Sequence, residues 1–417
     1  MDRTDPRAFE ALRVPGFRAY LVTFALTMMA DNIEHVISYW VAFQKFHSPA
    51  LGGFAVVSHW LPYLLFSVAA GALNDRFDSR RIIQAGVGLF MGVSIGWGYF
   101  FVTGTLQTWH AMVLLVLHGC AGVLWSTSSQ MLLYDIVGVA ALQSAVRLNA
   151  TARYLSVLIG PAVGSLMMLT LGPTRAIFLN AAFYLPLLIW LVGAPYGRHF
   201  RGAAAAPKRA VRGLADIAET VRDIRGVPTI GAMVLLAGVA SFFVGNSYQA
   251  QMPGFAHDLG HGDPGVAYTM LLGADAAGAL VAGFLLESRG GLLRTQSSSA
   301  TRLALLWAAA LLAFSFARSY LMALPLLFMA GFFELSFSSM AQTLVQMHAP
   351  ETMRGRVIGL FNMSAAGLRT FSGVTVGLAG SLWTVHVSLA ASASAFILVA
   401  AIIVARSRPA GGALNGG

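Results

Sequence analysis

Apolar runs of about 20 residues recur along the whole chain, and they limit the folds that this chain can adopt. Examples are 82–103 and 384–405. A hydrocarbon layer of about 30 Å requires about 20 apolar residues for each helical crossing. Only 11% of the residues are charged, whereas soluble domains carry about 25%. These features predict an all-α polytopic membrane protein.

Twelve transmembrane helices are predicted between turn sequences such as HAPE at 348–351. Their expected ranges are 17–44, 51–74, 82–103, 109–134, 141–171, 174–195, 227–252, 264–287, 298–317, 320–347, 355–380 and 384–405. The prediction divides the chain into a six-helix bundle at 1–195, a polar linker at 196–226 and a six-helix bundle at 227–417. Residues 213–224 of the linker are expected to form a short amphipathic helix on the membrane surface.

Lysine and arginine are distributed unevenly among the predicted loops. With the amino terminus placed in the cytoplasm, 21 of the 27 basic residues fall on the cytoplasmic side and three on the opposite side. Cytoplasmic loops of membrane proteins carry an excess of positive charge. We therefore expect an inner (cytoplasmic) membrane protein with both termini in the cytoplasm. The net charge of +10 follows from this topology, and nucleic acid is not an expected partner.

The two halves of the chain resemble each other at a nearly constant offset. Pairs separated by 212 or 213 positions are Gln130 and Gln342, Asn149 and Asn362, and the segments GALND at 71–75 and GFLLE at 283–287. Matches in corresponding helices indicate a duplicated six-helix unit. Parallel repeats with a binding site between them are typical of one large class of secondary transporters.

The segment GALNDRFDSRR at 71–81 resembles the loop motif Gly-x-Leu-Ala-Asp-Arg-x-Gly-Arg-Arg of the major facilitator superfamily. The matching residues are Gly71, Leu73, Asp75, Arg76 and Arg80, and the departures are Asn74, Asp78 and Ser79. The segments LNATARYLSVLIGPAVGS at 148–165 and APETMRGRVIGLFN at 349–362 further resemble the enterobactin-exporter-like branch. The resemblance implies the major facilitator fold, with twelve transmembrane helices in two six-helix bundles.

The loop motif is expected to act in gating. Gly71 would let neighbouring helices approach closely. Asp75 would accept hydrogen bonds from another helix end and pair with a basic side chain. Arg76, Arg80 and Arg81 would hold acidic groups on the cytoplasmic face, and Glu287 is the repeat counterpart of Asp75. The alternative for the arginines is that they serve only the positive-inside topology.

The predicted fifth helix carries GPAVG at 160–164. Gly160, Pro161 and Gly164 resemble a glycine-proline motif that this superfamily associates with antiport and export. Pro161 would bend the helix, and the glycines would allow tight contact across the two halves. An ordinary kinked helix is the alternative, because Ala152 stands where the longer motif has an earlier glycine.

Three ionisable residues lie near the middle of the first predicted helix. An ionised side chain at mid-membrane costs about 2.5–3.5 kcal/mol on insertion scales, so it should face water or a partner. Asp31, Glu34 and His35 share one stripe of this helix, and Ile33 and Ile37 lie opposite them. The stripe is therefore expected to face a central cavity.

Further polar residues lie in helices that line the cavity in the superfamily. The expected substrate-binding residues are His35, His59, Asn149, Asn246, Tyr248, Gln249, Asp275, Glu334 and Arg369. Asp31 or Glu34 is the expected proton carrier, with Arg153 or Arg147 as the competing charge. The alternative for either acid is a structural ion pair between helices 1 and 5. His118 is more typical of a packing or hydrogen-bonding residue.

The sequence thus predicts a secondary active transporter that works by alternating access. We expect proton-coupled antiport that exports a small organic molecule, which is drug-like, siderophore-like or a metabolite. The expected partners are this substrate and membrane lipid, the expected state is a monomer, and protons replace any cofactor. No Walker loop or HExxH motif is present, so an enzyme is not expected.

Two alternatives remain open at this point. A divalent transition-metal transporter would use the oxygen and nitrogen ligands of Asp31, Glu34, His35 and His59. A non-transporting membrane sensor is the alternative from another functional class.

Overall fold

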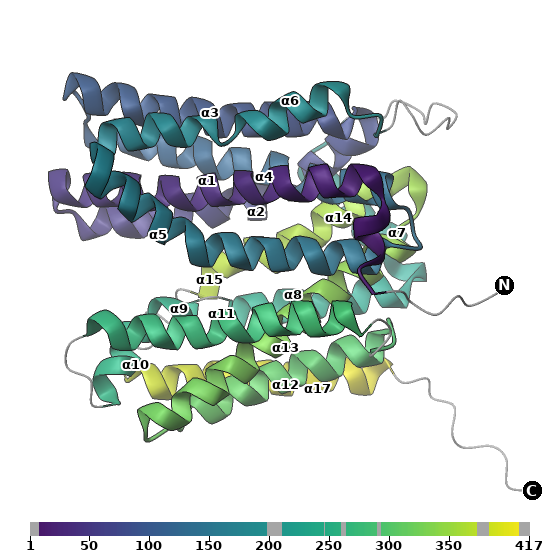
Figure 1. The fold of residues 1–417 in the computed structure, drawn as a ribbon. Coiled ribbons are helices and arrows are strands. Elements are labelled where there is room, and N and C mark those ends of the chain that lie inside the picture. Colours follow the sequence, from purple (N-terminus) through teal and green to yellow (C-terminus); the bar gives the residue numbers. More distant parts are fainter. Residues whose placement is uncertain are drawn as a thin grey trace, which may run out of the picture.

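The computed structural model describes residues 8–197, 211–245, 247–259, 264–289, 293–372 and 383–407, and within these ranges the chain is helical and has no strand. The helices run roughly along one direction in two groups (Figure 1). We call the group up to α6 the first half and the group from α8 onward the second half.

The helices of the first half follow the predicted order. They are α1 (Pro15–Phe46), α2 (Pro49–Arg76), α3 (Ser79–Thr103), α4 (Thr108–Val137), α5 (Leu142–Ala182) and α6 (Leu185–Gly193). The range of α5 includes a sharp change of direction at Gly172, where φ is 77°. The predicted fifth helix and the first part of the sixth are therefore joined in α5, with the turn at the expected position.

The second half contains more interruptions than expected. Its helices are α8 (Pro228–Phe243), α9 (Ser247–Ala250), α10 (Met252–Asp258), α11 (Pro264–Ser288), α12 (Ser297–Ser315), α13 (Tyr320–His348), α14 (Arg354–Asn362), α15 (Arg369–Ser372) and α17 (Val385–Ser407). A π-helical turn, η5 (Met363–Gly367), separates α14 from α15. Of the predicted helix 355–380, residues 373–380 lie outside the described part.

The continuous helix predicted at 227–252 is wrong, because the chain breaks after α8. Gly245 has a φ of 51°, which favours glycine. The amide groups of Val244 and Gly245 both donate to the carbonyl oxygen of Ala240, which ends the regular helix. The break redirects the chain into α9, which carries Tyr248 and Gln249.

Eight stretches of the described chain are long and apolar enough to cross a membrane. One of them, Leu142–Gly193, contains two of the predicted crossings. The 32-residue α1 is not among the eight, and its polar stripe of Asp31, Glu34 and His35 lowers its hydropathy. The prediction of an all-α, multi-pass membrane protein is confirmed, and the number twelve stays a prediction.

The glycines of α5 pack within the first half. A Cβ added at Gly160 would lie 2.6 Å from the Cβ of Asn32, and one added at Gly164 would lie 3.3 Å from the Cα of Ile33. Both neighbours belong to α1. The expected glycine contact across the halves is therefore wrong, because this face of α5 is already covered by α1.

The described part of the linker forms α7 (Leu214–Asp223). Asp216 is buried and accepts a hydrogen bond from the amide of Arg212 at 2.7 Å. A short helix is thus present at the predicted position, and its placement on the membrane surface stays a prediction. It lies beside α14, at the end of the molecule where α1 begins and α17 ends (Figure 1). We call this the terminal end.

Candidate functional site

His118 of α4 lies between two carboxylates of α1. Its Nδ1 is 2.7 Å from Oε1 of Glu34, and its Nε2 is 2.8 Å from Oδ1 of Asp31. All three residues are buried, with exposed fractions of 4%, 2% and 9% for His118, Glu34 and Asp31. Ser94 of α3 donates a further hydrogen bond to Oε2 of Glu34. One imidazole and two carboxylates are therefore in direct contact at this site.

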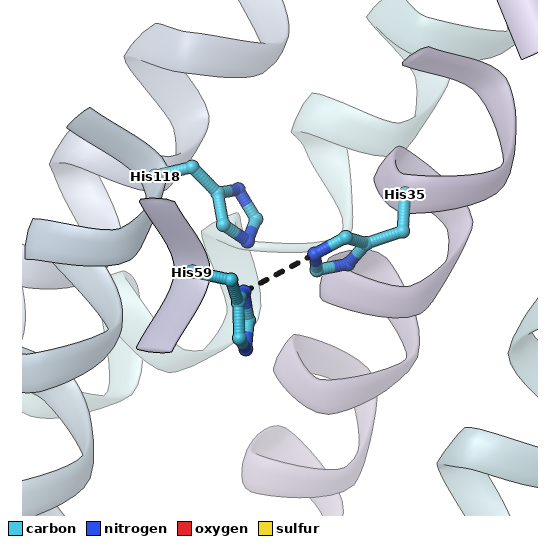
Figure 2. Close-up of side chains that lie close together, drawn as sticks. All are labelled: His35, His59 and His118. Carbon is cyan, nitrogen blue, oxygen red and sulfur yellow. Dashed lines mark hydrogen bonds between the residues drawn. The ribbon is translucent and has the colours of Figure 1, made fainter. Parts of the chain in front are cut away.

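Two more histidines adjoin this group, and Figure 2 shows the three imidazoles converging from α1, α2 and α4. Nδ1 of His35 lies 2.7 Å from the carbonyl oxygen of Asp31. A carbonyl oxygen can only accept, so Nδ1 carries the hydrogen. Nε2 of His35 then faces Nδ1 of His59 at 3.3 Å. We call Asp31, Glu34, His35, His59 and His118 the His118 cluster.

The polar stripe of α1 points into the first half. The expectation that Asp31 and Glu34 face a central cavity is corrected, because each acid has its partner on another helix of the same half. The side chain between them is His118, for which the sequence predicts packing or hydrogen bonding, and its contact with Glu34 confirms the hydrogen bonding. A lone histidine in an apolar run gave no signal of this role, since its partners lie 84 and 87 residues earlier in the chain.

A cavity of about 230 Å³ opens one helical turn beyond the His118 cluster, toward the end opposite the terminal end. Its walls include Ser38, Tyr39, Phe43, Trp97 and Leu115. The ring of Tyr39 lies 5.1 Å from that of His35. Tyr39 therefore lies between this cavity and the His118 cluster.

A second buried acidic group lies in the second half. The hydroxyl of Tyr248 lies 3.1 Å from Oδ1 of Asp275 and 3.4 Å from Oε2 of Glu334. Gln249 donates to Oδ2 of Asp275 at 2.9 Å. These four predicted substrate-binding residues are therefore brought together, and the break after α8 makes the contact possible.

Aromatic and cationic side chains lie between the two halves. The guanidinium of Arg369 lies 5.1 Å from the ring centroid of Trp60 on α2. That of Arg153 lies 5.3 Å from the ring centroid of Tyr154. Arg369 is also within electrostatic range of Arg153 and Glu334. Asn149 precedes Arg153 by one helical turn in α5. Its buried Oδ1 has no hydrogen-bond partner among the described residues.

At the terminal end, α2 and α14 make direct backbone contact between the halves. A Cβ added at Gly71 would lie 2.1 Å from the carbonyl oxygen of Gly355. Asp75 accepts hydrogen bonds from the amides of Gly355 at 2.7 Å and Arg356 at 3.1 Å. Nε of Arg356 lies 3.5 Å from the same carboxylate. The predicted close approach at Gly71 and the helix-end role of Asp75 are both present.

The repeat counterpart of Asp75 makes an equivalent contact. Glu287 at the end of α11 accepts a hydrogen bond from Ser144 at the start of α5. Nη1 of Arg147 lies 4.0 Å from Glu287 and donates to the carbonyl oxygen of Leu286 at 2.9 Å. Arg147 therefore joins the halves at the terminal end, and the expectation that it opposes Asp31 or Glu34 is corrected.

Arg80 holds the loop between α2 and α3. Its guanidinium pairs with Asp78 at 2.8 Å and donates to the carbonyl oxygen of Ala194 at 2.6 Å. Burial acts to raise the pKa of the Asp78 carboxyl, but the hydrogen bonds and charge of Arg80 outweigh it and hold the pKa below its ordinary value. The guanidinium of Arg76 lies 5.2 Å from the ring centroid of Phe77.

A polar contact between the halves was missed by sequence reasoning. Nε2 of Gln130 donates to Oδ1 of Asn362 at 2.8 Å, and Nδ2 of Asn362 lies 3.2 Å from Oγ1 of Thr127. Both Gln130 and Asn362 had appeared only as members of repeat pairs. A polar residue repeated at the same place in both halves is the signal that could have identified them.

The family described as transmembrane secretion effectors matches residues 7–415 of this sequence. The chain belongs to this family. This family is part of the major facilitator superfamily of transporters, which confirms the resemblance read from the sequence.

Relatives and solved structures agree with the family. The multidrug efflux pump Tap of Mycobacterium tuberculosis (strain ATCC 25618 / H37Rv) is 27% identical over 232 residues, which cover 52% of this chain and 54% of Tap. The chain thus spans about half the length of this curated relative. The human organic anion transporter MFSD10 (TETRAN) has a TM-score of 0.73 at 14% identity, covering 93% of this chain and 100% of that one. The E. coli fucose:proton symporter FucP also has a TM-score of 0.73 at 13% identity, covering 94% and 98%.

Some of the predicted site residues lie elsewhere. Asn246 is outside the described residues. Pro161 lies inside α5, where the backbone stays helical. The predicted metal ligands were Asp31, Glu34, His35 and His59. In the structure Glu34 contacts Nδ1 of His118. The three imidazole rings that converge belong to His35, His59 and His118.

Proposed function

We propose that this member of the family exports a small, drug-like organic molecule in exchange for protons. It works by alternating access, as a monomer in the inner membrane with both termini in the cytoplasm. The observation that carries the proposal is His118 held between Asp31 and Glu34 inside the first half.

The arrangement around His118 suits a proton carrier. Two carboxylates and one imidazole in a low-dielectric bundle can hold one more or one fewer proton without leaving an acid unpaired. The cavity beyond Tyr39 lies one helical turn from the cluster, on the side opposite the terminal end, and protons would enter from that side. Asp31 and Glu34 are therefore the coupling residues, and His118 is their exchanging partner.

The second acidic group, formed by Asp275 and Glu334, suits binding of the substrate. Asp275, Glu334 and Tyr248 provide negative charge and hydrogen bonding, and Trp60 at the boundary between the halves provides an aromatic face that already holds a cation, the guanidinium of Arg369. Such a combination favours an amphipathic molecule with a protonated amine, since a cation on an aromatic ring and near a carboxylate is stabilised. The similarity to Tap supports a drug-like substrate.

The contacts at the terminal end support alternating access. Asp75 with α14 and Glu287 with α5 close the same side of the molecule by equivalent bonds in the two repeats. With the termini in the cytoplasm, this conformation is closed to the cytoplasm. Opening toward the cytoplasm then requires both contacts to separate.

Transport in proteoliposomes tests the proposal. The purified chain is reconstituted, and efflux of the cationic dye ethidium is followed under an imposed pH gradient. We expect pH-driven dye movement, which Asp31→Asn and Glu34→Gln each reduce at least tenfold while downhill dye exchange persists. Asp258→Asn is the matched control, because this side chain is 44% exposed and outside the His118 cluster. Equal pH dependence in the parent and both variants would exclude these acids as coupling residues.

A further inference from the structure

The three histidines have a geometry that proton exchange does not require. One ring nitrogen from each of His35, His59 and His118 lies within 4.8 Å of the others, and the three side chains come from α1, α2 and α4 (Figure 2). We propose that these histidines bind a divalent transition-metal ion of the Zn²⁺ type through three imidazole nitrogens, with the fourth position left to water.

The spacing of the nitrogens fits such an ion. Zn–N bonds of about 2.0–2.1 Å at tetrahedral angles place two ligand nitrogens about 3.3 Å apart. Nε2 of His35 and Nδ1 of His59 are separated by 3.3 Å. The nitrogen of His118 must approach by about 1.5 Å at most to complete the set, a shift that side-chain rotation supplies.

In His35 and His118, the ring nitrogen that faces away from the proposed ion already contacts an oxygen atom, as is usual in metal sites. Metal-bound histidines donate their second N–H to a carbonyl or carboxylate, which fixes the ring and its tautomer. Nδ1 of His35 does so to the carbonyl oxygen of Asp31 at 2.7 Å. Nδ1 of His118 lies 2.7 Å from Oε1 of Glu34. In both rings Nε2 is therefore the nitrogen turned toward the centre.

The nitrogen of His118 that faces the centre has unused capacity. Nε2 of His118 is buried and has no described hydrogen-bond partner, and its near neighbour is Oδ1 of Asp31, an ion-pair contact of 2.8 Å. Oδ1 of Asp31 is likewise buried without a hydrogen bond. Buried polar atoms of this kind are uncommon in native proteins and point to an additional ligand.

Charge and access also suit a cation. Asp31 and Glu34 place two carboxylates next to the site, which offsets the cost of taking a divalent ion out of water. The side chain of His35 is 21% exposed, and its ring contacts that of Tyr39, which lines the cavity. A bound ion engages Nε2 of His118, the atom nearest to Asp31, so it would compete with the proton exchange proposed above.

Metal binding to the purified protein tests this site. Isothermal titration calorimetry with Zn²⁺ is combined with the visible absorption of bound Co²⁺, which reports tetrahedral coordination. We expect one ion per chain, a tetrahedral Co²⁺ spectrum, and affinities at least tenfold weaker in His35→Ala and in His59→Ala. These variants leave the carboxylate contacts of His118 in place, and thermal melting without metal verifies their folding.

His348→Ala is the matched control. His348 ends α13, where its Nδ1 lies 2.8 Å from the carbonyl oxygen of Leu344, away from the His118 cluster. Its Zn²⁺ affinity should stay within twofold of the parent. Absence of Zn²⁺ binding in the parent, or equal binding in the parent and both cluster variants, would overturn the site. Because the measurement needs no transport, its failure is separate from a failure of proton-coupled export.

Discussion

The bond between Asp75 and the start of α14 provides a quantitative test of how the terminal end stays closed. In Asp75→Asn the side chain keeps its size and one oxygen, but it loses the negative charge and one acceptor. The two amides of Gly355 and Arg356 at 2.7 and 3.1 Å can then no longer both be satisfied. The Arg356 guanidinium at 3.5 Å also loses its counter-charge.

The size of the effect follows from these contacts. A hydrogen bond to a charged group contributes about 1.5–3 kcal/mol net, and the side chains of Arg356 and Asp75 are only 11% and 14% exposed. Losing one such bond destabilises the closed conformation by about 2 kcal/mol. This corresponds to a roughly 30-fold change in the ratio of closed to open molecules.

Distance measurements between spin labels can detect this change. Phe77 of the first half and Met347 of the second are 47% and 39% exposed, and both lie at the terminal end. Phe77→Cys and Met347→Cys are labelled in a Cys120→Ser background, since Cys120 is the only native cysteine. We expect Asp75→Asn to raise the fraction of long distances.

Asp78→Asn is the matched control for this measurement. Asp78 lies in the same loop, but its carboxylate binds Arg80 within the first half. It should leave the distance distribution unchanged. If Asp75→Asn and the parent give the same distribution, the Asp75 contact does not hold the terminal end closed.

Two further substitutions probe the packing between halves and the second acidic group. Gly355→Ala would place a Cβ 2.2 Å from a backbone oxygen of α2 and should open the terminal end in the same spin-label assay, whereas Gly88→Ala meets nothing within 4 Å and should not. Tyr248→Phe removes the hydroxyl that lies 3.1 Å from Asp275, which should destabilise the protein by about 1–3 kcal/mol in detergent denaturation. Tyr99→Phe, at an exposed ring, should change stability by less than about 0.5 kcal/mol, and equal effects of the two tyrosine variants would argue against the bond to Asp275.

The sequence by itself determined the membrane architecture. Apolar runs of this length have few alternatives to membrane-spanning helices, because backbone groups in lipid must be satisfied within the helix. The repeat also related Asp75 to Glu287, and both join the halves at the terminal end. These features depend on local composition and on a fixed offset along the chain, so they can be read without coordinates.

Only the tertiary structure decided which polar groups meet. His118 pairs with Asp31 and Glu34 because α1 and α4 pack in a particular rotation, and a pattern within one helix cannot specify the facing residue on another. Helix packing likewise places Gly160 against α1 and pairs Arg147 with Glu287. Contacts between distant segments depend on how whole helices pack against one another, so they cannot be derived from the composition of each segment.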